Sequence, residues 1–267
     1  MIKKEIKNFN LQTIADSGQC FRMEPEGADS CRIIAHNRIL RVKDNLDGSF
    51  SFDTSEEDFK NIWEEYFDLR TDYSRFIRAI PESDVFLTAA AEYGSGIRIL
   101  KQEPFETLIT FIISQRKNIP AIKKCVEELS LRFGEELSPG IHAFPTPEAL
   151  SEASVEELNA CSLGYRTEYV RRAARRIALG DVSLSELCKL DDAALFDALL
   201  SFHGVGKKVA NCVMLFAYHR IAAFPVDVWI DRVIKEKYSG AFPLEKYEGF
   251  AGVIQQYLFY FGRSAGN

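Results

Sequence analysis

The residue types most suited to chemistry lie between positions 202 and 229, where a glycine-rich turn precedes two lysines and an aspartate follows. Lys208 comes two residues after Gly206, in the first turn of a predicted helix. The positive end of the helix dipole disfavours an ammonium there, and Lys207 acts in the same direction if both side chains face one cleft. Because nucleophilic and Schiff-base chemistry needs the neutral amine, we predict that Lys208 is the catalytic nucleophile.

Asp227 is the second catalytic candidate, nineteen residues after Lys208 in the segment AFPVDVW. Pro225 restricts the chain just before it, and an aspartate that opens a helix is in most proteins an ordinary N-cap. A capping carboxylate is also held in a fixed place, where it can stabilise positive charge on a sugar as its base leaves. Since the two roles are compatible, we predict that Asp227 assists Lys208.

The turn at residues 202–206, FHGVG, joins two helical patterns. Its glycines permit positive φ and leave room for backbone N–H groups to approach a ligand, and the start of the following helix can bind phosphate. Gly204, Gly206 and Lys207 are therefore predicted to grip a DNA backbone without reading bases. A glycine-capped helix–helix corner is an equally good interpretation of the turn taken alone.

Charge is distributed unevenly along a chain whose formal net charge is −6. An acidic total argues mildly against nucleic acid as a partner. Residues 115–124, 164–176 and 201–220, however, hold clusters of Lys and Arg with one acidic residue among them, Glu168. We expect these segments to form a local surface for DNA phosphates, with three separate solvated helix faces as the alternative.

The elements that must position these residues show two kinds of pattern. Residues 28–54 alternate apolar and polar side chains between Asp-Asn and Asp-Gly pairs, which predicts an antiparallel β-meander or a hairpin. From about Glu56 onward, apolar residues recur three and four positions apart, which predicts helices. The predicted fold class is α+β: a small N-terminal antiparallel β subdomain, residues 1–83, followed by a mostly α-helical body, residues 84–267, that contains a helix–hairpin–helix motif.

The sequence also argues against several classes of site and location. The six cysteines are scattered, without a CxxC pair or a histidine at metal-ligand spacing, which favours reduced thiols over a zinc site or an iron–sulfur cluster. We therefore expect no metal and no cofactor. Since no apolar run approaches about 18 residues and no signal-peptide pattern is present, we expect no membrane association and a cytoplasmic location, at the nucleoid if the organism is bacterial.

The combination of GVGKKVAN (204–211) with PVDVW (225–229) resembles the helix–hairpin–helix, Gly/Pro–Asp superfamily of DNA glycosylases. Its members share a catalytic aspartate after the proline, and a lysine-bearing branch couples base removal to β-elimination. The resemblance assigns these roles to Asp227 and Lys208. Similarity over most of the chain points to the 8-oxoguanine DNA glycosylase/AP lyase family in its bacterial form. The four-cysteine C-terminal cluster of the endonuclease III branch is missing, which weighs against that branch.

The resemblance also implies a pocket for an extruded base. SGQCFRM (17–23) is similar to a segment whose glycine carbonyl accepts the N7–H that 8-oxoguanine has and guanine lacks, a role that falls to Gly18. AGVIQQYLFYFGR (251–263) is similar to the family's final helix, in which Gln255 would bond the Watson–Crick edge of the base and Phe259 would stack on it opposite Cys212. Without the resemblance, Gly18 is a turn residue, and Cys212 and Phe259 are core residues.

Other residues acquire DNA-binding roles from the same resemblance. YGSGIRILKQEPFETLITFIISQRKNI (93–119) is similar to a long helix whose polar terminal turn enters the duplex, which puts Arg116 at the wedge position beside Lys117 and Asn118. LGYRTEYV (163–170) matches a turn in which Tyr165 would wedge into the base stack and Arg166 would contact the estranged base. Taken alone, Tyr165 is an interface aromatic.

Three positions depart from the family pattern. Ala121 stands where some members carry an arginine that reads the opposite cytosine, which predicts relaxed opposite-base selectivity. Trp229 replaces a histidine of some members, and Gly262 falls where those members have an aspartate. We interpret this paired difference as a variant form of phosphate contact at Trp229, closer to bacterial relatives.

The chain is thus predicted to be a bifunctional DNA glycosylase/AP lyase. It would flip 8-oxoguanine out of double-stranded DNA, excise it through a Schiff base on Lys208 and cleave the strand by β-elimination. The resemblance implies a monomer that needs no metal for the chemistry, with a monovalent ion able to bridge hairpin carbonyls and a DNA phosphate. The alternatives are a glycosylase of the same fold for another oxidised base, and a non-catalytic helix–hairpin–helix DNA-binding protein.

Overall fold

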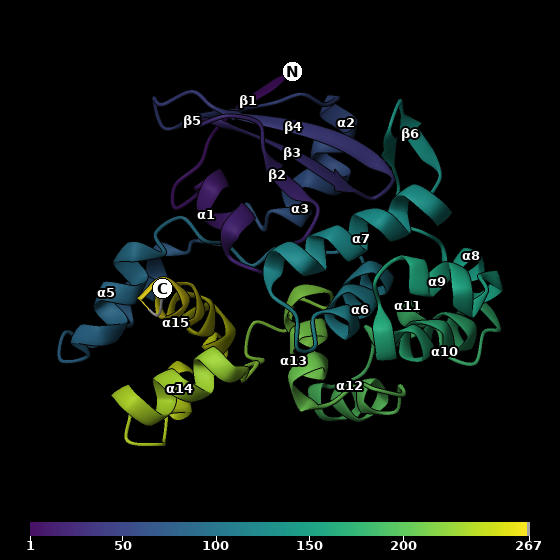
Figure 1. The fold of residues 1–267 in the computed structure, drawn as a ribbon. Coiled ribbons are helices and arrows are strands. Elements are labelled where there is room, and N and C mark those ends of the chain that lie inside the picture. The colour runs from purple at the N-terminus through teal and green to yellow at the C-terminus, as the bar shows by residue number, and fades with distance from the viewer. Residues whose placement is uncertain (266–267) are drawn as a thin grey trace.

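The first part of the chain folds into a five-stranded antiparallel sheet, in a computed structural model that describes residues 1–265 (Figure 1). His36 and Asn37, both at positive φ, form the tight turn between its two longest strands. The predicted meander is confirmed as β3-β4-β5, and short edge strands extend it on both sides. The strand order is β1-β5-β4-β3-β2, with the bounds β1 (Ile2–Glu5), β2 (Met23–Pro25), β3 (Ser30–Ala35), β4 (Arg38–Asp44) and β5 (Ser49–Phe52).

Helices make up most of the remaining chain, as predicted, so the fold class is α+β. A two-stranded hairpin of β6 (Glu136–Ser138) and β7 (Ile141–His142) interrupts them. The helices are α1 (Leu11–Asp16), α2 (Glu56–Asp58), α3 (Glu64–Tyr66), α4 (Ser74–Arg78), α5 (Val85–Tyr93), α6 (Pro104–Ile113), α7 (Ile119–Phe133), α8 (Pro147–Glu152), α9 (Val155–Ala160), α10 (Thr167–Ala178), α11 (Leu184–Leu187), α12 (Asp192–Leu200), α13 (Lys207–Phe216), α14 (Val228–Lys237) and α15 (Ala251–Ala265).

The helix starts near the predicted site differ in how they are capped. Asn118 caps α7 by accepting the Ala121 N–H at 2.9 Å, and Asp227 caps α14 in the same way. α13 begins at Lys207, as predicted, after Gly206, which has no side chain to cap it. The first N–H groups of α13 are therefore left for an external acceptor.

Two hydrophobic cores divide the molecule. The first lies against the sheet and contains edge-to-face aromatic pairs such as Phe9 with Phe67. The second runs through the helical body. Phe76 already belongs to the second core, whereas Leu100 belongs to the first, so the chain passes between them more than once. The subdomain boundary near residue 83 stays a prediction.

The extended segment 97–103 ties the sheet to the helical body. Its Arg98 is buried, and the guanidinium donates hydrogen bonds to five carbonyls, those of Lys7, Asn8, Phe67, Asp68 and Thr71. Gln19 is held by the same segment, since its Nε2 donates to Arg98 O at 2.8 Å and its Oε1 accepts from Leu100 N at 2.8 Å. The adjacent Gly18 is thereby fixed relative to the helical body.

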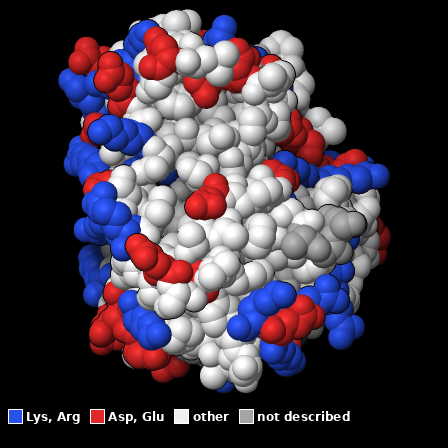
Figure 2. All heavy atoms as spheres, turned by 90° about the vertical axis from the view of Figure 1, so that its left-hand side faces the viewer, with Lys and Arg blue, Asp and Glu red and all other residues white. Residues whose placement is uncertain are grey.

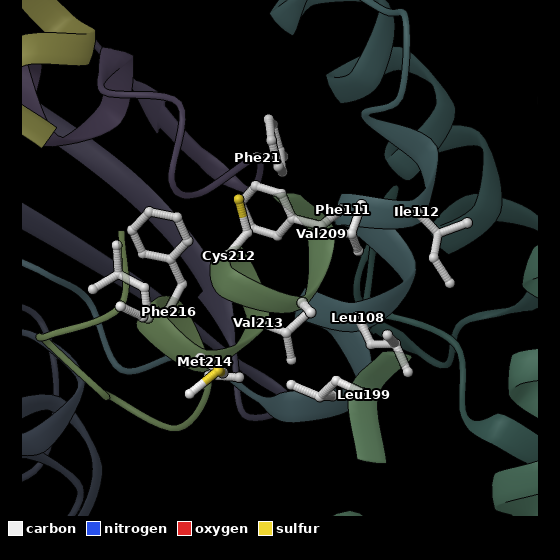
Figure 3. Packing of buried hydrophobic residues seen from close by; sticks show 14 of the residues in the cluster. Phe21, Leu108, Phe111, Ile112, Leu199, Val209, Cys212, Val213, Met214 and Phe216 are labelled. Atoms are coloured by element: carbon white, nitrogen blue, oxygen red, sulfur yellow. The ribbon is translucent and has the colours of Figure 1, made fainter. Parts of the chain in front are cut away.

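Helix α13 packs against α6 in the second core. Figure 3 shows Phe111 of α6 beside Val209 and Cys212 of α13. The rings of Phe111 and Phe216 are stacked, with centroids 5.4 Å apart. This packing holds the first turn of α13, which carries Lys208, next to the end of α6.

Figure 2 views the side of the molecule that carries α5, α14 and α15. Charged side chains of both signs lie around its margin, and its middle is largely uncharged. Within residues 1–265, no helix combines the length and the apolar character that a bilayer span requires.

Candidate active site

Lys208 is half-buried and its amine is held against the end of α6. Its Nζ donates to Ser114 Oγ at 3.1 Å and lies 5.0 Å from the centroid of the Phe111 ring. Ser114 Oγ in turn donates to Phe111 O at 2.8 Å, which leaves its lone pairs facing the amine. The nitrogen of Lys208 is therefore positioned by the protein.

Asp227 is the N-cap of α14, as its sequence context predicted. Its Oδ1 accepts the N–H groups of Trp229 at 3.0 Å and Ile230 at 2.9 Å. Burial raises the pKa of this carboxyl above its usual range, although the Ile230 N–H and the charge of Lys208 oppose the shift. No ion pair within 4 Å joins Asp227 to Lys208 in residues 1–265, although both residues line the same cavity.

One small cavity brings the predicted catalytic and base-recognition residues together. It is lined by Gly18, Phe111, Lys208, Cys212, Phe216, Pro225, Asp227, Gln255, Gln256 and Phe259. All six residues predicted for catalysis and base recognition are in this set, and their individual roles stay predictions. The cavity volume of about 40 Å³ admits water but no purine, so a base could enter only if the walls moved apart.

Gly18 reaches the cavity from the loop between α1 and β2. Its φ is +76°, a conformation that L side chains rarely adopt. A Cβ at this position would lie 3.0 Å from Cε1 of Phe259 and 3.2 Å from Cδ1 of Ile119. The backbone conformation thus requires glycine here, and a Cβ would in addition press on the ring of Phe259, another residue that lines the cavity.

Cys212 forms an apolar wall one helical turn after Lys208. The thiol is buried, and burial raises its pKa to about 11, although the charge of Lys208 acts in the opposite direction. The side chain is therefore a neutral thiol at neutral pH. A neutral, polarizable sulfur suits the stacking role that was predicted for it.

Gln255 and Gln256 form the end of the cavity contributed by α15, and both are buried. Gln255 Nε2 donates to Pro225 O at 3.1 Å, and Gln256 Nε2 donates to Gln255 Oε1 at 3.1 Å. Sequence reasoning did not find Gln256, nor the contact of Ser114 with Lys208. No sequence signal links the latter pair, since 94 residues separate them.

The turn between α6 and α7 carries the predicted wedge. Arg116 is exposed and has φ +53°, an uncommon conformation for a side chain of this size. Lys117 Nζ donates to Ser162 O at 3.0 Å, and Asn118 caps α7. Arg116 is thus presented outward, while its neighbours hold the turn in place.

Tyr165 and Arg166 form a second turn at this surface. Tyr165 is 52% exposed, and the guanidinium of Arg166 lies 4.3 Å from the centroid of its ring. Arg166 itself is buried, with its Nε donating to Gln115 O at 2.8 Å and Nη1 donating to Leu163 O at 3.1 Å. The base contact predicted for Arg166 would require some of these bonds to break, and it stays a prediction.

The two glycines of the hairpin have different environments. Gly204 has φ +83°, and a Cβ there would lie 2.3 Å from the ring of Tyr169. Gly206 has φ −100° and ψ 179°, and a Cβ there would meet nothing within 4 Å. The protein itself therefore requires glycine at position 204 but not at position 206.

Gln115 links the wedge turn to the hairpin, which the sequence did not predict. Its Nε2 donates to Gly204 O at 3.1 Å, and its carbonyl accepts the Arg166 guanidinium. The ring of Tyr169 packs edge-on against His203, with centroids 4.9 Å apart. The three turns that carry the predicted DNA contacts are therefore fixed to one another.

Lys207 and Trp229 lie at the starts of α13 and α14. Lys207 is exposed, and in residues 1–265 it is without an ion-pair partner within 4 Å. Trp229 is half-buried, with the Arg232 guanidinium 5.6 Å from its ring centroid. Both positions are compatible with phosphate contact.

Metal binding has one candidate form. Within residues 1–265, no three His, Cys, Asp or Glu side chains lie close enough to hold an ion. The hairpin offers carbonyls instead: Phe202 O accepts the Val205 N–H at 3.0 Å and Gly204 O accepts from Gln115. Each carbonyl keeps a second lone pair, so these oxygens fit the monovalent ion that the resemblance implies.

Comparison with protein families divides the chain into two adjoining matches. Residues 1–108 match the 8-oxoguanine DNA glycosylase, N-terminal domain. Residues 109–241 match the HhH-GPD superfamily base excision DNA repair protein family. The second match contains Lys208, Asp227 and the hairpin.

Solved structures resemble the chain over its whole length. MBOgg1, solved with a low affinity DNA ligand, is 37% identical with a TM-score of 0.93, over 99% of this chain and 96% of that one. The Clostridium acetobutylicum 8-oxoguanine glycosylase/lyase, solved with double-stranded DNA containing cytosine opposite 8-oxoG, is 35% identical with a TM-score of 0.91, and the match covers 100% of this chain and 98% of that one.

A relative found by sequence comparison is the Saccharomyces cerevisiae N-glycosylase/DNA lyase. It is 36% identical in a match that covers 60% of this chain and less than half (46%) of that protein.

Proposed function

Because this chain belongs to the 8-oxoguanine DNA glycosylase/lyase family, we propose that it excises 8-oxoguanine from duplex DNA and then cleaves the strand at the abasic site. The observation that carries the proposal is the shared cavity: the Lys208 amine and the Asp227 carboxylate face one space with Gly18 and Gln255. The protein would act as a monomer in the cytoplasm, at the nucleoid in a bacterium.

Base binding comes first in the proposed reaction. The target nucleotide leaves the base stack, at a cost of about a few kcal/mol that wedge and pocket contacts offset. Phe259 moves away from Gly18 to open the cavity, and the base then lies between Phe259 and Cys212. The Gly18 carbonyl accepts the N7–H of 8-oxoguanine, which guanine lacks.

Bond exchange at the sugar follows. Lys208 Nζ forms a bond to C1′ as the bond from C1′ to the base breaks, and the base leaves with the electron pair and takes up a proton. Asp227 stabilises the positive charge that develops on the sugar. The sugar ring opens to an imine on Lys208, a proton is lost from C2′, and the C3′–O bond breaks to release the 3′ phosphate.

Grip on the DNA backbone is assigned to the hairpin and the adjoining turns. The uncapped start of α13 offers N–H groups and the positive end of its dipole. Gly206 supports this role, because nothing inside the protein requires glycine there and a close phosphate would. Lys207 and Trp229 flank the same site, and Arg116 and Tyr165 occupy the space from which the base is extruded.

Borohydride trapping on an 8-oxoguanine duplex tests the proposal. The wild-type protein should form a covalent adduct, and Lys208→Gln should abolish it and lower excision by more than about 10³-fold. Lys207→Gln is the matched control, which should keep the adduct. An adduct in the Lys208 variant would assign the nucleophile elsewhere, and its absence in the wild type would exclude a Schiff-base mechanism.

The lesion is tested separately. Excision of 8-oxoguanine and thymine glycol is compared in duplexes of the same sequence, with cytosine and then adenine opposite 8-oxoguanine. Faster removal of thymine glycol would replace 8-oxoguanine with an oxidised pyrimidine as the substrate. Similar rates with either opposite base would support the relaxed selectivity predicted from Ala121.

A further inference from the structure

One buried polar atom beside the proposed base pocket has no partner. Gln256 is 3% exposed and lines the same cavity as Lys208 and Asp227. Its Oε1 accepts no hydrogen bond from residues 1–265. Buried carbonyl oxygens in folded proteins are nearly always hydrogen-bonded. An unpartnered buried acceptor on a residue that lines the cavity is therefore left for a donor on a ligand that enters it.

The orientation of this carboxamide is fixed by its neighbour. Gln256 Nε2 donates to Gln255 Oε1 at 3.1 Å, and Gln255 Nε2 donates to Pro225 O at 3.1 Å. Rotating the Gln256 amide by half a turn would set its oxygen against Gln255 Oε1, and two acceptors repel. The chain of bonds from Pro225 thus keeps the free group of Gln256 an acceptor.

The hydrogen-bonding capacity left in the cavity matches one kind of base. Gln255 Oε1 keeps one lone pair and Gln256 Oε1 keeps both. The Watson–Crick edge of a guanine-type base presents two neighbouring donors, N1–H and the 2-amino group. An adenine-type edge would instead bring the N1 acceptor against these oxygens. Two adjacent acceptors therefore favour the guanine-type edge.

We propose that Gln256 is a specificity-determining residue, whose Oε1 accepts a hydrogen bond from the 2-amino group of the extruded purine. The proposal rests on the proposed function, because it assumes that a base occupies this cavity. A base without the 2-amino group would leave the buried oxygen unpaired, which is how a site built for hydrogen bonding rejects an analogue.

The decisive experiment varies the protein atom and its partner on the base together. Single-turnover excision is measured on 8-oxoguanine and on 8-oxohypoxanthine, which differs from it by lacking the 2-amino group. Gln256→Met keeps the length of the side chain and removes its hydrogen bonds. We expect this variant to lose about tenfold on 8-oxoguanine and less than about twofold on 8-oxohypoxanthine.

Cleavage of a preformed abasic site is the internal control, since it uses Lys208 but no base. Gln256→Met should keep this activity within about twofold of the wild type, because the change lies on the base side of the cavity. If the Met variant does not fold, the wild-type protein still tests the proposal. It should excise 8-oxoguanine faster than 8-oxohypoxanthine, and equal rates on the two bases would overturn the proposal.

Other outcomes separate this proposal from the proposed function. Equal losses on both bases would show that Gln256 only supports Gln255, and unchanged excision would show no role; either result overturns the proposal alone. A wild-type protein that cuts abasic DNA but leaves 8-oxoguanine in place would overturn the lesion assignment, and the proposal with it. That pattern is seen before any variant is made.

Discussion

The candidate active-site cavity and the turns proposed to bind DNA, which we call the gripping surface, are built on opposite principles. Among the described residues that line the cavity, Gln256 has a buried Oε1 without a partner, and Phe259 lies close to Gly18, where a base would lie. In the turns, the polar groups already have protein partners: Gln115 holds Gly204, and Arg166 holds Gln115. The cavity thus has a lining residue with an unpaired acceptor, whereas the turns are held to one another by bonds within the protein and leave the uncapped start of α13 open.

The difference follows from what each region must recognise. A backbone phosphate has the same shape in every sequence, so a rigid, preformed surface binds it without reorganisation. A lesion must be distinguished from a normal base, which requires unsatisfied groups that only the correct base can pair. The hairpin contains one glycine of each kind. Gly204 is required by contacts inside the protein, whereas nothing inside the protein requires glycine at Gly206, which leaves room for a ligand.

Among the substitutions that compare the two regions, Asp227→Asn should have the largest effect and act on the cavity alone. Removing a preorganised charge near the developing positive sugar should lower the excision rate by about 10²–10³-fold. DNA affinity should be unchanged, because the amide oxygen can still cap α14. Rapid-quench assays measure the excision rate, and filter binding measures DNA affinity. A loss of affinity alone would show that Asp227 contributes to DNA binding and not to excision.

The same variant should be more stable than the wild type near neutral pH. Burial raises the folded-state pKa of Asp227, so its ionised form destabilises the fold above that pKa. As pH falls toward the ordinary Asp range, the wild-type carboxyl becomes neutral and the advantage of asparagine should shrink. Thermal unfolding of both proteins between about pH 7 and pH 4 measures this trend.

The two hairpin glycines provide the next test. Gly206→Ala should keep its Tm but weaken DNA binding by about tenfold, because a methyl group would keep a phosphate from the start of α13. Gly204→Ala, the matched control, should lose about 1–3 kcal/mol of folding free energy, because its Cβ collides with Tyr169 at positive φ. Exchanged phenotypes would contradict the assignment of the two glycines.

Gln115→Ala should have a smaller effect, confined to the gripping surface. Without the bond from Gln115 to Gly204, the wedge turn and the hairpin are no longer fixed together, and DNA binding should weaken by about fivefold. Cleavage by the fully bound enzyme should change little. The control is Gln12→Ala. Gln12 lies on α1, and its side chain donates comparable hydrogen bonds to loop carbonyls. If Gln115→Ala lowered the cleavage rate of the DNA-bound enzyme more than it lowered DNA affinity, Gln115 would act in the cavity and not in the gripping surface.

Lys207→Ala should give the smallest change at fixed salt, about threefold in affinity, and a distinct change in salt dependence. The slope of log affinity against log salt should fall by about one for one lost phosphate contact. Lys60→Ala, which removes a lysine paired with Glu56, should leave the slope unchanged. An unchanged slope for Lys207→Ala would remove this lysine from the phosphate site.

Sequence reasoning was reliable where the pattern was long or the turn chemistry was specific. The meander at residues 28–54, the start of α13 at Lys207 and the cap at Asp227 were all predicted and are confirmed. It did not find α1, β1, β2 or the β6–β7 hairpin. These elements have two to six residues, too few for a period of 2 or 3.6 to be distinct.

The sequence by itself determined the local features: the α+β fold class, the helix–hairpin–helix turn and the helix starts at which Lys207 and Asp227 lie. Capping, glycine conformation and hydrophobic period depend on residues a few positions apart, so they can be read along the chain. Only the tertiary structure decided that Ser114 holds the amine of Lys208, that Gly204 and Gly206 have different reasons to be glycine, and that Gln256, a residue that lines the cavity, has a buried oxygen without a partner in residues 1–265. Those facts are distances between segments far apart in sequence, and packing of the whole chain sets them.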